Sequence, residues 1–314
     1  MIAEQRRAGT TLALDAGQTA IKVHLTRSGG DTIQNVFPGI RTSQRLLPQL
    51  AGVVAAVGAE LSDPIDVVTL GVSGLAESDA DAAELLALFP STRVREVHLA
   101  HDSVTSFLGA LGDRRGAVIA SGTGVVTLGV GAARVARVDG WGNIMGDAGS
   151  GYWIGRRGLE SAMRSYDGRE APTALVDVVR SRWPDLENAY VDLQSDPDRV
   201  RVVASLAEAV TQLAPTDAVA AQITLHAARE LAHSVITALR RVSDAEDHHE
   251  EVVAAIGGVF RSDSVRRRFE ELVTEARPNA RIEPAHGTAL DGARSLSALA
   301  EQHPLKAHVF VAAT

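Results

Sequence analysis

The sequence of 314 residues is long enough for two domains, since a domain commonly takes about 150 residues. Hydrophobic residues make up 45% and charged residues 22%, which is typical of a folded globular chain. A formal net charge of −8 argues against the basic surface of a nucleic-acid-binding protein. Because cysteine is absent, disulfides, thiolate zinc sites, iron–sulfur clusters and cysteine nucleophiles are excluded.

Several common nucleotide-binding and targeting signals are also absent. The only lysines, Lys22 and Lys306, follow Ile21 and Leu305, so there is no Gly-Lys-Ser/Thr phosphate loop. No Gly-x-Gly-x-x-Gly fingerprint occurs either. No apolar run reaches the ~18 residues of a membrane helix, and the N-terminus lacks the pattern of a secretory signal. We therefore expect a cytoplasmic protein that binds neither membranes nor nucleic acid.

In the first part of the chain, strands and helices are expected to alternate. Apolar–polar alternation and cap residues predict strands over 11–14, 20–26, 65–72 and 94–99, and helices over 43–60, 78–88 and 103–111. Ser78 and Asp79 are the expected caps of the second helix.

A polar turn at 112–116 is followed by what looks like a second start of the same pattern. Strands are expected over 117–120, 125–130 and 252–256, a glycine-rich loop over 139–158, helices over most of 159–242, and further helices over 263–275 (capped by Asp263) and 287–302. The predicted division is a domain over 1–113 and a second domain over 114–314. The second domain carries a helical insertion, and its last helix is expected to be able to pack back on the first domain.

Two glycine- and threonine-containing turns and one glycine pair are candidates for anion binding. The turns are Asp15-x-Gly17-x-Thr19 and Ser121-Gly122-Thr123-Gly124, and the pair is Gly257-Gly258 after a buried strand. Glycine lets the backbone approach an anion, and clustered N–H groups bind it. Asp15 could hold a metal through water. Each feature taken alone favours an ordinary tight turn, whereas two such turns, one at the head of each half, favour a site.

Asp102 and the stretch 139–153 carry the remaining chemistry. Asp102 follows an apolar strand, where a carboxylate can accept a proton from a hydroxyl, although it could equally cap the next helix. The stretch 139–153 combines two tryptophans, aspartate and asparagine with several glycines. Polar side chains beside an aromatic platform are suited to a sugar ring.

Taken together, these motifs resemble a known family. The two turns, the Asp between them, Trp-Gly-x-x-Met-Gly-Asp-x-Gly-Ser-x-Tyr-Trp over 141–153 and the late Gly-Gly are similar to N-acetylglucosamine kinase-like members of the BadF/BadG/BcrA/BcrD ATPase family, in the actin/hexokinase-like sugar kinase superfamily. The resemblance implies an α/β fold of two ribonuclease H-like domains flanking a cleft. It also implies ATP and Mg²⁺ as cofactors, phosphorylation of an amino sugar at its 6-hydroxyl, and a homodimer.

The resemblance also assigns roles to individual residues. Asp102 would be the general base. ATP phosphates would lie at Asp15, Gly17 and Thr19 and at Gly122, Thr123 and Gly124, with the adenosine beside Gly257 and Gly258 and the sugar on Trp141, Gly142 and Asp147.

One departure concerns the sugar. The family usually has an Asn in the loop after the third strand, whereas here Arg41 or Thr42 takes that position. The acceptor is therefore expected to be N-acetylglucosamine or a different, carboxylate-bearing sugar. A third possibility is an ATPase that drives a partner protein, although the missing cysteines count against the reductase-activator form. A regulator without catalysis is expected to lack the base, and Asp102 is present.

Overall fold

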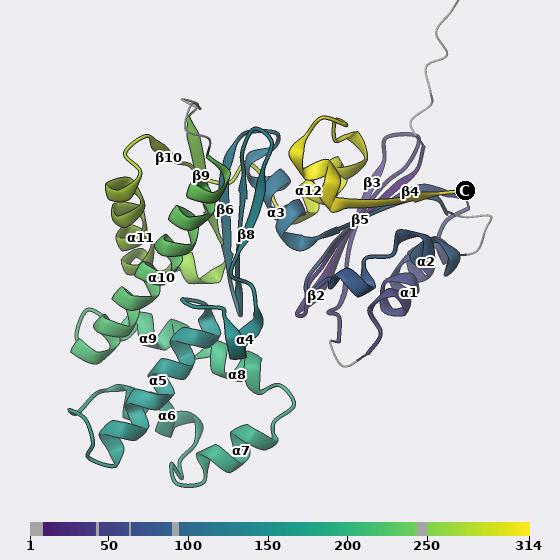
Figure 1. Ribbon diagram of the computed structural model, residues 1–314. Coiled ribbons are helices and arrows are strands. Elements are labelled where there is room, and N and C mark those ends of the chain that lie inside the picture. The colour runs from purple at the N-terminus through teal and green to yellow at the C-terminus, as the bar shows by residue number, and fades with distance from the viewer. Residues whose placement is uncertain (1–8, 42–43, 63, 90–93, 244–249) are drawn as a thin grey trace, which may run out of the picture. The chain divides into compact units, whose positions relative to one another are not determined.

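The computed structural model describes residues 9–41, 44–62, 64–89, 94–243 and 250–314 (Figure 1). The chain forms two compact units, Met1–Arg114 with Ala285–Thr314, and Arg115–Pro284. The sequence placed residues 285–314 in the second domain with only the last helix returning. In the structure the whole segment belongs to the first unit. No helix of the described residues is both long enough and apolar enough to cross a membrane.

The first unit is built on a six-stranded mixed sheet. Its order is β11-β5-β4-β1-β2-β3, with β1, β4 and β5 mutually parallel and β2, β3 and β11 antiparallel to their neighbours. The carboxyl ends of β1, β4 and β5 therefore lie at one edge of the sheet. The strands are β1 Thr11–Ala16, β2 Ala20–Thr26, β3 Thr32–Pro38, β4 Ile65–Val72, β5 Val94–His101 and β11 Val309–Ala313.

Helices cover both faces of this sheet (Figure 1). On one face lie α1 Leu46–Ala59 and α2 Ala82–Ala87, and on the other α3 Asp102–Leu111 and α12 Ala289–Ser295. Short 3₁₀ turns occupy Glu77–Asp79, Leu296–Ala298 and Pro304–His308. The core contains the apolar residues of the strands and the buried side of α1, including Leu14, Leu50 and Leu70, all fully buried.

Glycines explain why the end of the chain returns to the first unit. A Cβ at Gly292 of α12 would lie 1.8 Å from the carbonyl oxygen of Thr105, and one at Gly109 of α3 would lie 1.9 Å from that of Thr288. The two helices therefore pack backbone to backbone, which only glycine at both positions permits.

The second unit repeats the topology of the first around a five-stranded sheet. Its order, β10-β9-β6-β7-β8, matches β5-β4-β1-β2-β3: an antiparallel three-stranded meander followed by parallel strands beside the first strand. This arrangement is the ribonuclease H-like fold, present twice. The strands are β6 Gly116–Ser121, β7 Val125–Val130, β8 Val135–Val138, β9 Glu251–Ile256 and β10 Ala280–Ile282.

The helical segment of the second unit lies between β8 and β9 in sequence. Its longest helix, α10, packs against β6, β7 and β8, and α11 packs against α10 (Figure 1). The helices of this segment are α4 Gly142–Met145, α5 Gly151–Tyr166, α6 Leu175–Arg182, α7 Ala189–Ser195, α8 Arg199–Ser205, α9 Ala207–Leu213 and α10 Ala218–Val242. A 3₁₀ turn at Gly258–Arg261 and α11 Asp263–Ala276 follow β9.

Several local predictions were wrong. The helix expected from Ser78 begins at Ala82 instead, because Asp81 rather than Ser78 or Asp79 accepts the first free amide, that of Glu84. Ser262 rather than Asp263 caps α11. The expected loop 139–158 ends at Ser150, because the Ser150 hydroxyl caps a helix that continues through the later glycines.

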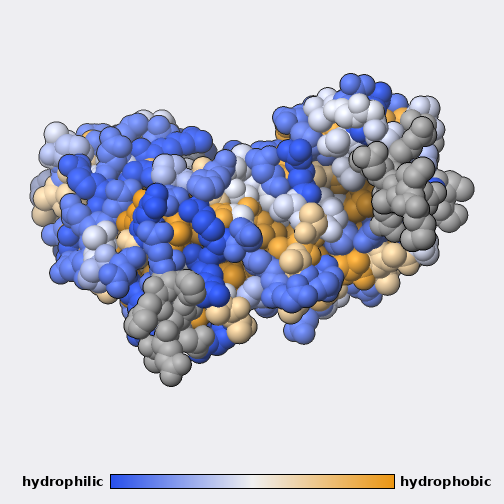
Figure 2. Space-filling model, turned by 90° about the horizontal axis from the view of Figure 1, so that it is seen from above, coloured by the Kyte–Doolittle hydropathy of each residue, from blue (hydrophilic) through white to orange (hydrophobic). Residues whose placement is uncertain are grey.

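The surface agrees with the composition. Polar and charged side chains predominate on the face shown in Figure 2, with apolar residues in smaller patches between them. Acidic groups outnumber basic ones in the chain, 39 to 31.

Acid is expected to destabilise the protein through buried histidine. His24 of β2 is 7% exposed, and its pKa is lowered by burial and by the nearby charge of Arg294. The folded state therefore keeps the His24 ring neutral at pH values where the unfolded chain protonates it. Stability is fully present above the ordinary histidine pKa of about 6.5 and falls as pH decreases below it. Burial lowers the pKa of His303 and His308 in the same direction.

Urea unfolding at several pH values tests this expectation. His24→Gln should flatten the fall in unfolding free energy between about pH 7 and pH 5. His226→Gln, a change on the exposed side of α10, is the matched control and should keep the wild-type slope. An unchanged slope in His24→Gln would assign the acid sensitivity to other groups.

Candidate functional site

The β1–β2 turn is held by the segment after β3. The Gly17 amide donates to the Ala20 carbonyl at 3.0 Å, and the Ile40 amide donates to the Gly17 carbonyl at 3.0 Å. A Cβ at Gly39 would lie 2.1 Å from the carbonyl oxygen of Gln18, so this approach requires glycine. Thr19 is left exposed at the tip, where its hydroxyl can meet a ligand.

Asp15 lies at the end of β1, beside that turn. Its carboxylate is 3.5 Å from the ammonium of Lys22, its cross-strand neighbour, and its side chain is 17% exposed. Burial raises the pKa of Asp15, the charge of Lys22 lowers it, and the nearby charge of Asp102 raises it. Asp15 and Asp102 thus interact electrostatically at the edge formed by the carboxyl ends of β1 and β5.

Asp102 is the first residue of α3, and it does not cap the helix. The cap is His101, whose Nδ1 accepts the Ser103 amide at 3.1 Å. Among the described residues, the buried Oδ1 of Asp102 has no hydrogen-bond partner. A buried acceptor without a donor is uncommon in folded proteins and points to a functional rather than a structural role.

Arg41 follows Ile40, whose amide bonds to the β1–β2 turn. The backbone amide and carbonyl of Arg41 both bond to the side-chain amide of Gln49, at 2.8 and 3.1 Å. Its backbone is therefore fixed, while its guanidinium is exposed and forms no ion pair with a carboxylate of the described residues. The alternative position, Thr42, lies outside the described residues.

In the second unit, the β6–β7 turn supports the start of a helix. The Gly122 amide donates to the Gly124 carbonyl at 2.8 Å. The carbonyls of Gly122 and Thr123 accept the first two amides of α5, those of Gly151 and Tyr152, at 2.8 and 3.0 Å. Within the described chain, the backbone amides of Thr123 and Gly124 donate to no backbone carbonyl, so they can bind an anion.

The glycine-rich loop is organised by Asp139, a residue to which neither the motifs nor the family resemblance assigned a role of its own. Its carboxylate accepts the backbone amides of Gly140, Asp147 and Ala148 at 2.7, 2.8 and 3.0 Å. Asp139 and Asp147 both have positive φ, 59° and 58°, a conformation that Asp tolerates better than most residues. In the sequence, only the spacing of eight residues between Asp139 and Asp147 in a glycine-rich stretch could have indicated this role.

Asp147 lies against the β6–β7 turn. It is 8% exposed, and a Cβ at Gly124 would lie 2.7 Å from its Oδ2. Its Oδ1 accepts the Val125 amide at 3.4 Å, and the amide of Gly142 also bonds to the carboxylate. Burial raises the pKa of Asp147, and the Val125 amide lowers it. Asp147 therefore connects the candidate phosphate turn with the candidate sugar loop.

Trp141 and Gly142 lie on the solvent side of the loop. The indole is 57% exposed, and the guanidinium of Arg137 stacks 4.6 Å from its ring centroid. Gly142 has a φ of 80° and begins the short helix α4. A flat ring with one face on a cation and its other side open can serve as a platform for a ligand.

Gly257 and Gly258, at the end of β9, differ in their surroundings. A Cβ at Gly257 (φ 101°) would lie 2.2 Å from the carbonyl oxygen of Ser121, so this residue lets β9 and β6 end close together. At Gly258, the first residue of the 3₁₀ turn, a Cβ would meet no atom within 4 Å, which leaves open space beside it. Gly257 thus permits the close packing of β9 against β6, and Gly258 leaves room for a flat ligand.

This difference gives a matched pair of variants. Gly257→Ala forces both a backbone clash and a strained φ, so it should lower the melting temperature by at least several degrees. Gly258→Ala causes neither a clash nor strain, so its melting temperature should be close to that of the wild type. If the adenosine lies beside Gly258, this variant should bind nucleotide more weakly. Equal melting temperatures for the two variants would contradict the packing derived for Gly257.

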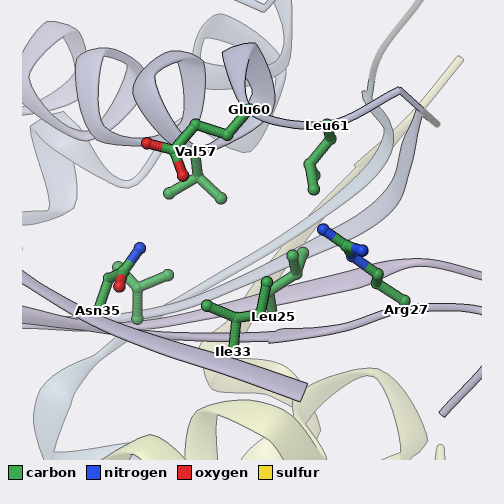
Figure 3. Close-up of a pocket in the computed structure, with 8 residues that line it drawn as sticks. Leu25, Arg27, Ile33, Asn35, Val57, Glu60 and Leu61 are labelled. Carbon is green, nitrogen blue, oxygen red and sulfur yellow. The ribbon is translucent and has the colours of Figure 1, made fainter. Parts of the chain in front are cut away.

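A pocket in the first unit lies away from these residues. It has a volume of about 50 Å³ between the end of α1 and strands β2 and β3 (Figure 3). Val57, Glu60 and Leu61 face Leu25 and Asn35 across it. Because Arg27, beside the β2–β3 turn, lines it as well, it lies toward the opposite end of the hairpin from the β1–β2 turn.

The chain contains the ribonuclease H-like unit twice, and each unit has an open turn between its first two strands. This arrangement is the actin/hexokinase ATPase fold. The chain belongs to the BadF/BadG/BcrA/BcrD ATPase family, which it matches over residues 12–293. The resemblance drawn from the motifs is confirmed, and so is the fold class.

Two curated relatives match parts of the chain. One is the N-acetylmuramic acid/N-acetylglucosamine kinase of Clostridium acetobutylicum, 29% identical over 177 residues, covering 52% of this chain and 55% of that protein. Another is the N-acetyl-D-glucosamine kinase of Dictyostelium discoideum, 27% identical over 58% of this chain and 60% of that protein. The chain thus spans little more than half the length of either relative.

A solved structure matches nearly the whole fold. A candidate N-acetylglucosamine kinase from Chromobacterium violaceum superposes with a TM-score of 0.71 at 22% identity, covering 91% of this chain and 98% of that one. At this identity the likeness concerns the fold.

Proposed function

We propose that the protein is an ATP-dependent sugar kinase that phosphorylates an amino sugar, N-acetylglucosamine in the first instance, at its 6-hydroxyl. The observation that carries this proposal is the carboxylate of Asp102 at the end of β5, whose buried Oδ1 accepts no hydrogen bond from the described residues. Both curated relatives are named as N-acetylglucosamine kinases, which supports the choice of sugar.

The residues of the two units suit the parts of a phosphoryl transfer. Such a reaction asks the protein to position the reactants, to stabilise charge and to accept the proton of the attacking hydroxyl. We assign the last task to Asp102. Phosphate contacts are assigned to Gly17 and Thr19 and to the turn 122–124, adenosine contacts to Gly257 and Gly258, and sugar contacts to Trp141, Gly142, Asp147 and Arg41.

Magnesium fits the acidic edge of the first unit. Mg²⁺ commonly keeps several waters and binds through one or two carboxylates together with substrate phosphates. Asp15 forms an ion pair with Lys22 and interacts electrostatically with Asp102, and its carboxylate can bind the ion through water. Among the described residues no group of three or more metal-ligating side chains occurs, which agrees with a site completed by ATP. The bound ion would neutralise phosphate charge.

A second candidate substrate is a sugar that carries a carboxylate. We assign Arg41, whose guanidinium pairs with no carboxylate of the described residues, to the loop position where the family usually has an amide. Arginine binds carboxylates in a bidentate manner. The C. acetobutylicum relative is named for N-acetylmuramic acid as well as for N-acetylglucosamine.

A coupled ADP-release assay over a panel of amino sugars and plain hexoses tests the proposal. We expect release that depends on N-acetylglucosamine. Release with N-acetylmuramic acid alone would make Arg41 the better guide to the substrate. ATP hydrolysis that no sugar stimulates would instead favour an ATPase acting on a partner protein. Light scattering on the same sample tests the homodimer that the family resemblance implies.

A further inference from the structure

The pocket between α1 and strands β2 and β3 has an apolar floor that the proposed function does not use (Figure 3). Val23, Leu25 and Val57 are 5% exposed or less, and they form this floor together with Ile33 and Leu61. The volume of the pocket is about 50 Å³. Since a cavity of about 150 Å³ holds a benzene ring, the pocket can enclose a short aliphatic segment of a few carbon atoms.

Three polar side chains line the rim of the pocket, and they separate into two ends. Figure 3 shows the Glu60 carboxylate and the Asn35 amide toward one end, and the Arg27 guanidinium beside Leu61 toward the other. All three rim residues are exposed. In the part of the chain that the structure describes, none of these side chains forms an ion pair or a hydrogen bond. The pocket therefore has a negative end and a positive end that are both available to a ligand.

The fold does not account for the carboxylate of Glu60. Glu60 is the C-cap residue of α1, where the helix dipole disfavours a negative charge, and the last turn of α1 contains no basic residue to offset it. A bound cation would remove this electrostatic cost, and the amide oxygen of Asn35 could accept a hydrogen bond from the same cation. The position of Glu60 therefore points to a ligand cation and not to a role in stability.

We propose that this pocket binds a short aliphatic ω-amino acid, a zwitterion whose ammonium and carboxylate are separated by a few methylene groups. The ammonium donates to Glu60 and to the amide oxygen of Asn35. The carboxylate accepts from the guanidinium of Arg27, and the methylene groups cover Leu25 and Ile33. None of these residues belongs to the candidate nucleotide and sugar sites, so the inference does not rest on the proposed function.

Each simpler ligand would use only part of the pocket. A metal cation or an inorganic anion would leave the apolar floor in contact with water, and a neutral apolar molecule would place hydrocarbon beside the charges of Glu60 and Arg27. An alkylamine or an aliphatic carboxylate would pair with one end alone. A zwitterion with an aliphatic spacer pairs with both ends and also removes the floor from water.

Isothermal titration calorimetry of the full chain tests the chemistry of the ligand. The probes are 4-aminobutyrate, glycine, and the one-ended controls butylamine and butyrate. 4-Aminobutyrate should bind about fivefold more tightly than either control, because each control lacks one exposed ion pair. Glycine should bind more weakly than 4-aminobutyrate, since its two charges are too close together to reach both ends. Equal affinities for 4-aminobutyrate and either control, or binding of none of the probes, would overturn the proposal.

Two charge variants should each remove one end of the site. Glu60→Gln should weaken the binding of 4-aminobutyrate and butylamine about fivefold and leave that of butyrate unchanged. Arg27→Gln should weaken the binding of 4-aminobutyrate and butyrate and leave that of butylamine unchanged. Ile33→Phe, a change on the exposed edge strand β3, should fill the space and weaken the binding of all three. Glu77→Gln changes an exposed carboxylate that does not line the pocket, so this matched control should bind each probe as the wild type does.

The melting temperature separates a ligand site from a structural role. Glu60→Gln removes a charge that the dipole of α1 disfavours, so without ligand its melting temperature should equal or exceed that of the wild type. A lower melting temperature with an unchanged affinity for 4-aminobutyrate would assign Glu60 to the fold and overturn the proposal.

Discussion

Asp102→Asn should lower kcat by about 10²- to 10⁴-fold, the usual cost of losing a general base. Asparagine keeps the size and polarity of the side chain but cannot take the hydroxyl proton, so the KM for sugar should change little. The structure removes the main competing role, because His101 and not Asp102 caps α3. Steady-state kinetics on the sugar that releases ADP, together with the melting temperature, measure both effects.

Asp217→Asn is the matched control for Asp102→Asn. Asp217 caps α10 and accepts amides of Ala174, Val219 and Ala220. These hydrogen bonds lower its pKa against the opposing effect of burial. Its variant should therefore lower the melting temperature and leave kcat nearly unchanged. If Asp102→Asn behaved like this control, keeping more than about half of the activity, Asp102 would be a residue of the fold.

The strands that carry the two turns could be predicted from the sequence, because their signal is local. Residues 20–26 and 65–72 alternate or run apolar between turn residues, and the structure has strands with those bounds. The exposed edge strand β3 and the C-terminal β11 were missed. In β3 only Phe37 is partly protected from solvent, so no buried face marks the strand.

Helix starts were harder to predict than strands, because a cap depends on where a side chain points. Asp79 and Asp263 are both good cap residues by type. In the structure Asp81 and Ser262 accept the first free amides instead. A histidine cap such as His101 has no strong sequence signature.

The glycine-rich loop shows what composition can and cannot predict. Its glycines predicted a shaped loop, and Trp141 is exposed on it. The role of Asp139 could not be predicted, because it depends on three amides converging on one carboxylate. The closeness of Asp147 to Gly124, 23 positions away along the chain, is likewise a property of the fold.

Asp147→Ala should raise the KM for sugar by roughly 5- to 150-fold and the KM for ATP little. The estimate takes ~1–3 kcal/mol for each polar group left unpaired when a partner is removed. Asp147 is buried beside Gly124, and its carboxylate also takes the amide of Gly142 in the candidate sugar loop. Because the proposed partners of Asp147 are sugar hydroxyls, its loss should affect sugar binding first. Initial rates with each substrate varied in turn measure the two KM values.

Two further variants separate contact from positioning. Asp147→Asn keeps the positive φ without strain, since asparagine tolerates it, and should show a smaller rise in sugar KM than Asp147→Ala. Asp139→Ala frees the amides of Gly140, Asp147 and Ala148, so it should lower the melting temperature as well as sugar affinity. If Asp147→Ala instead raised the KM for ATP and left that for sugar unchanged, Asp147 would belong to the β6–β7 phosphate turn, through Val125 and Gly124.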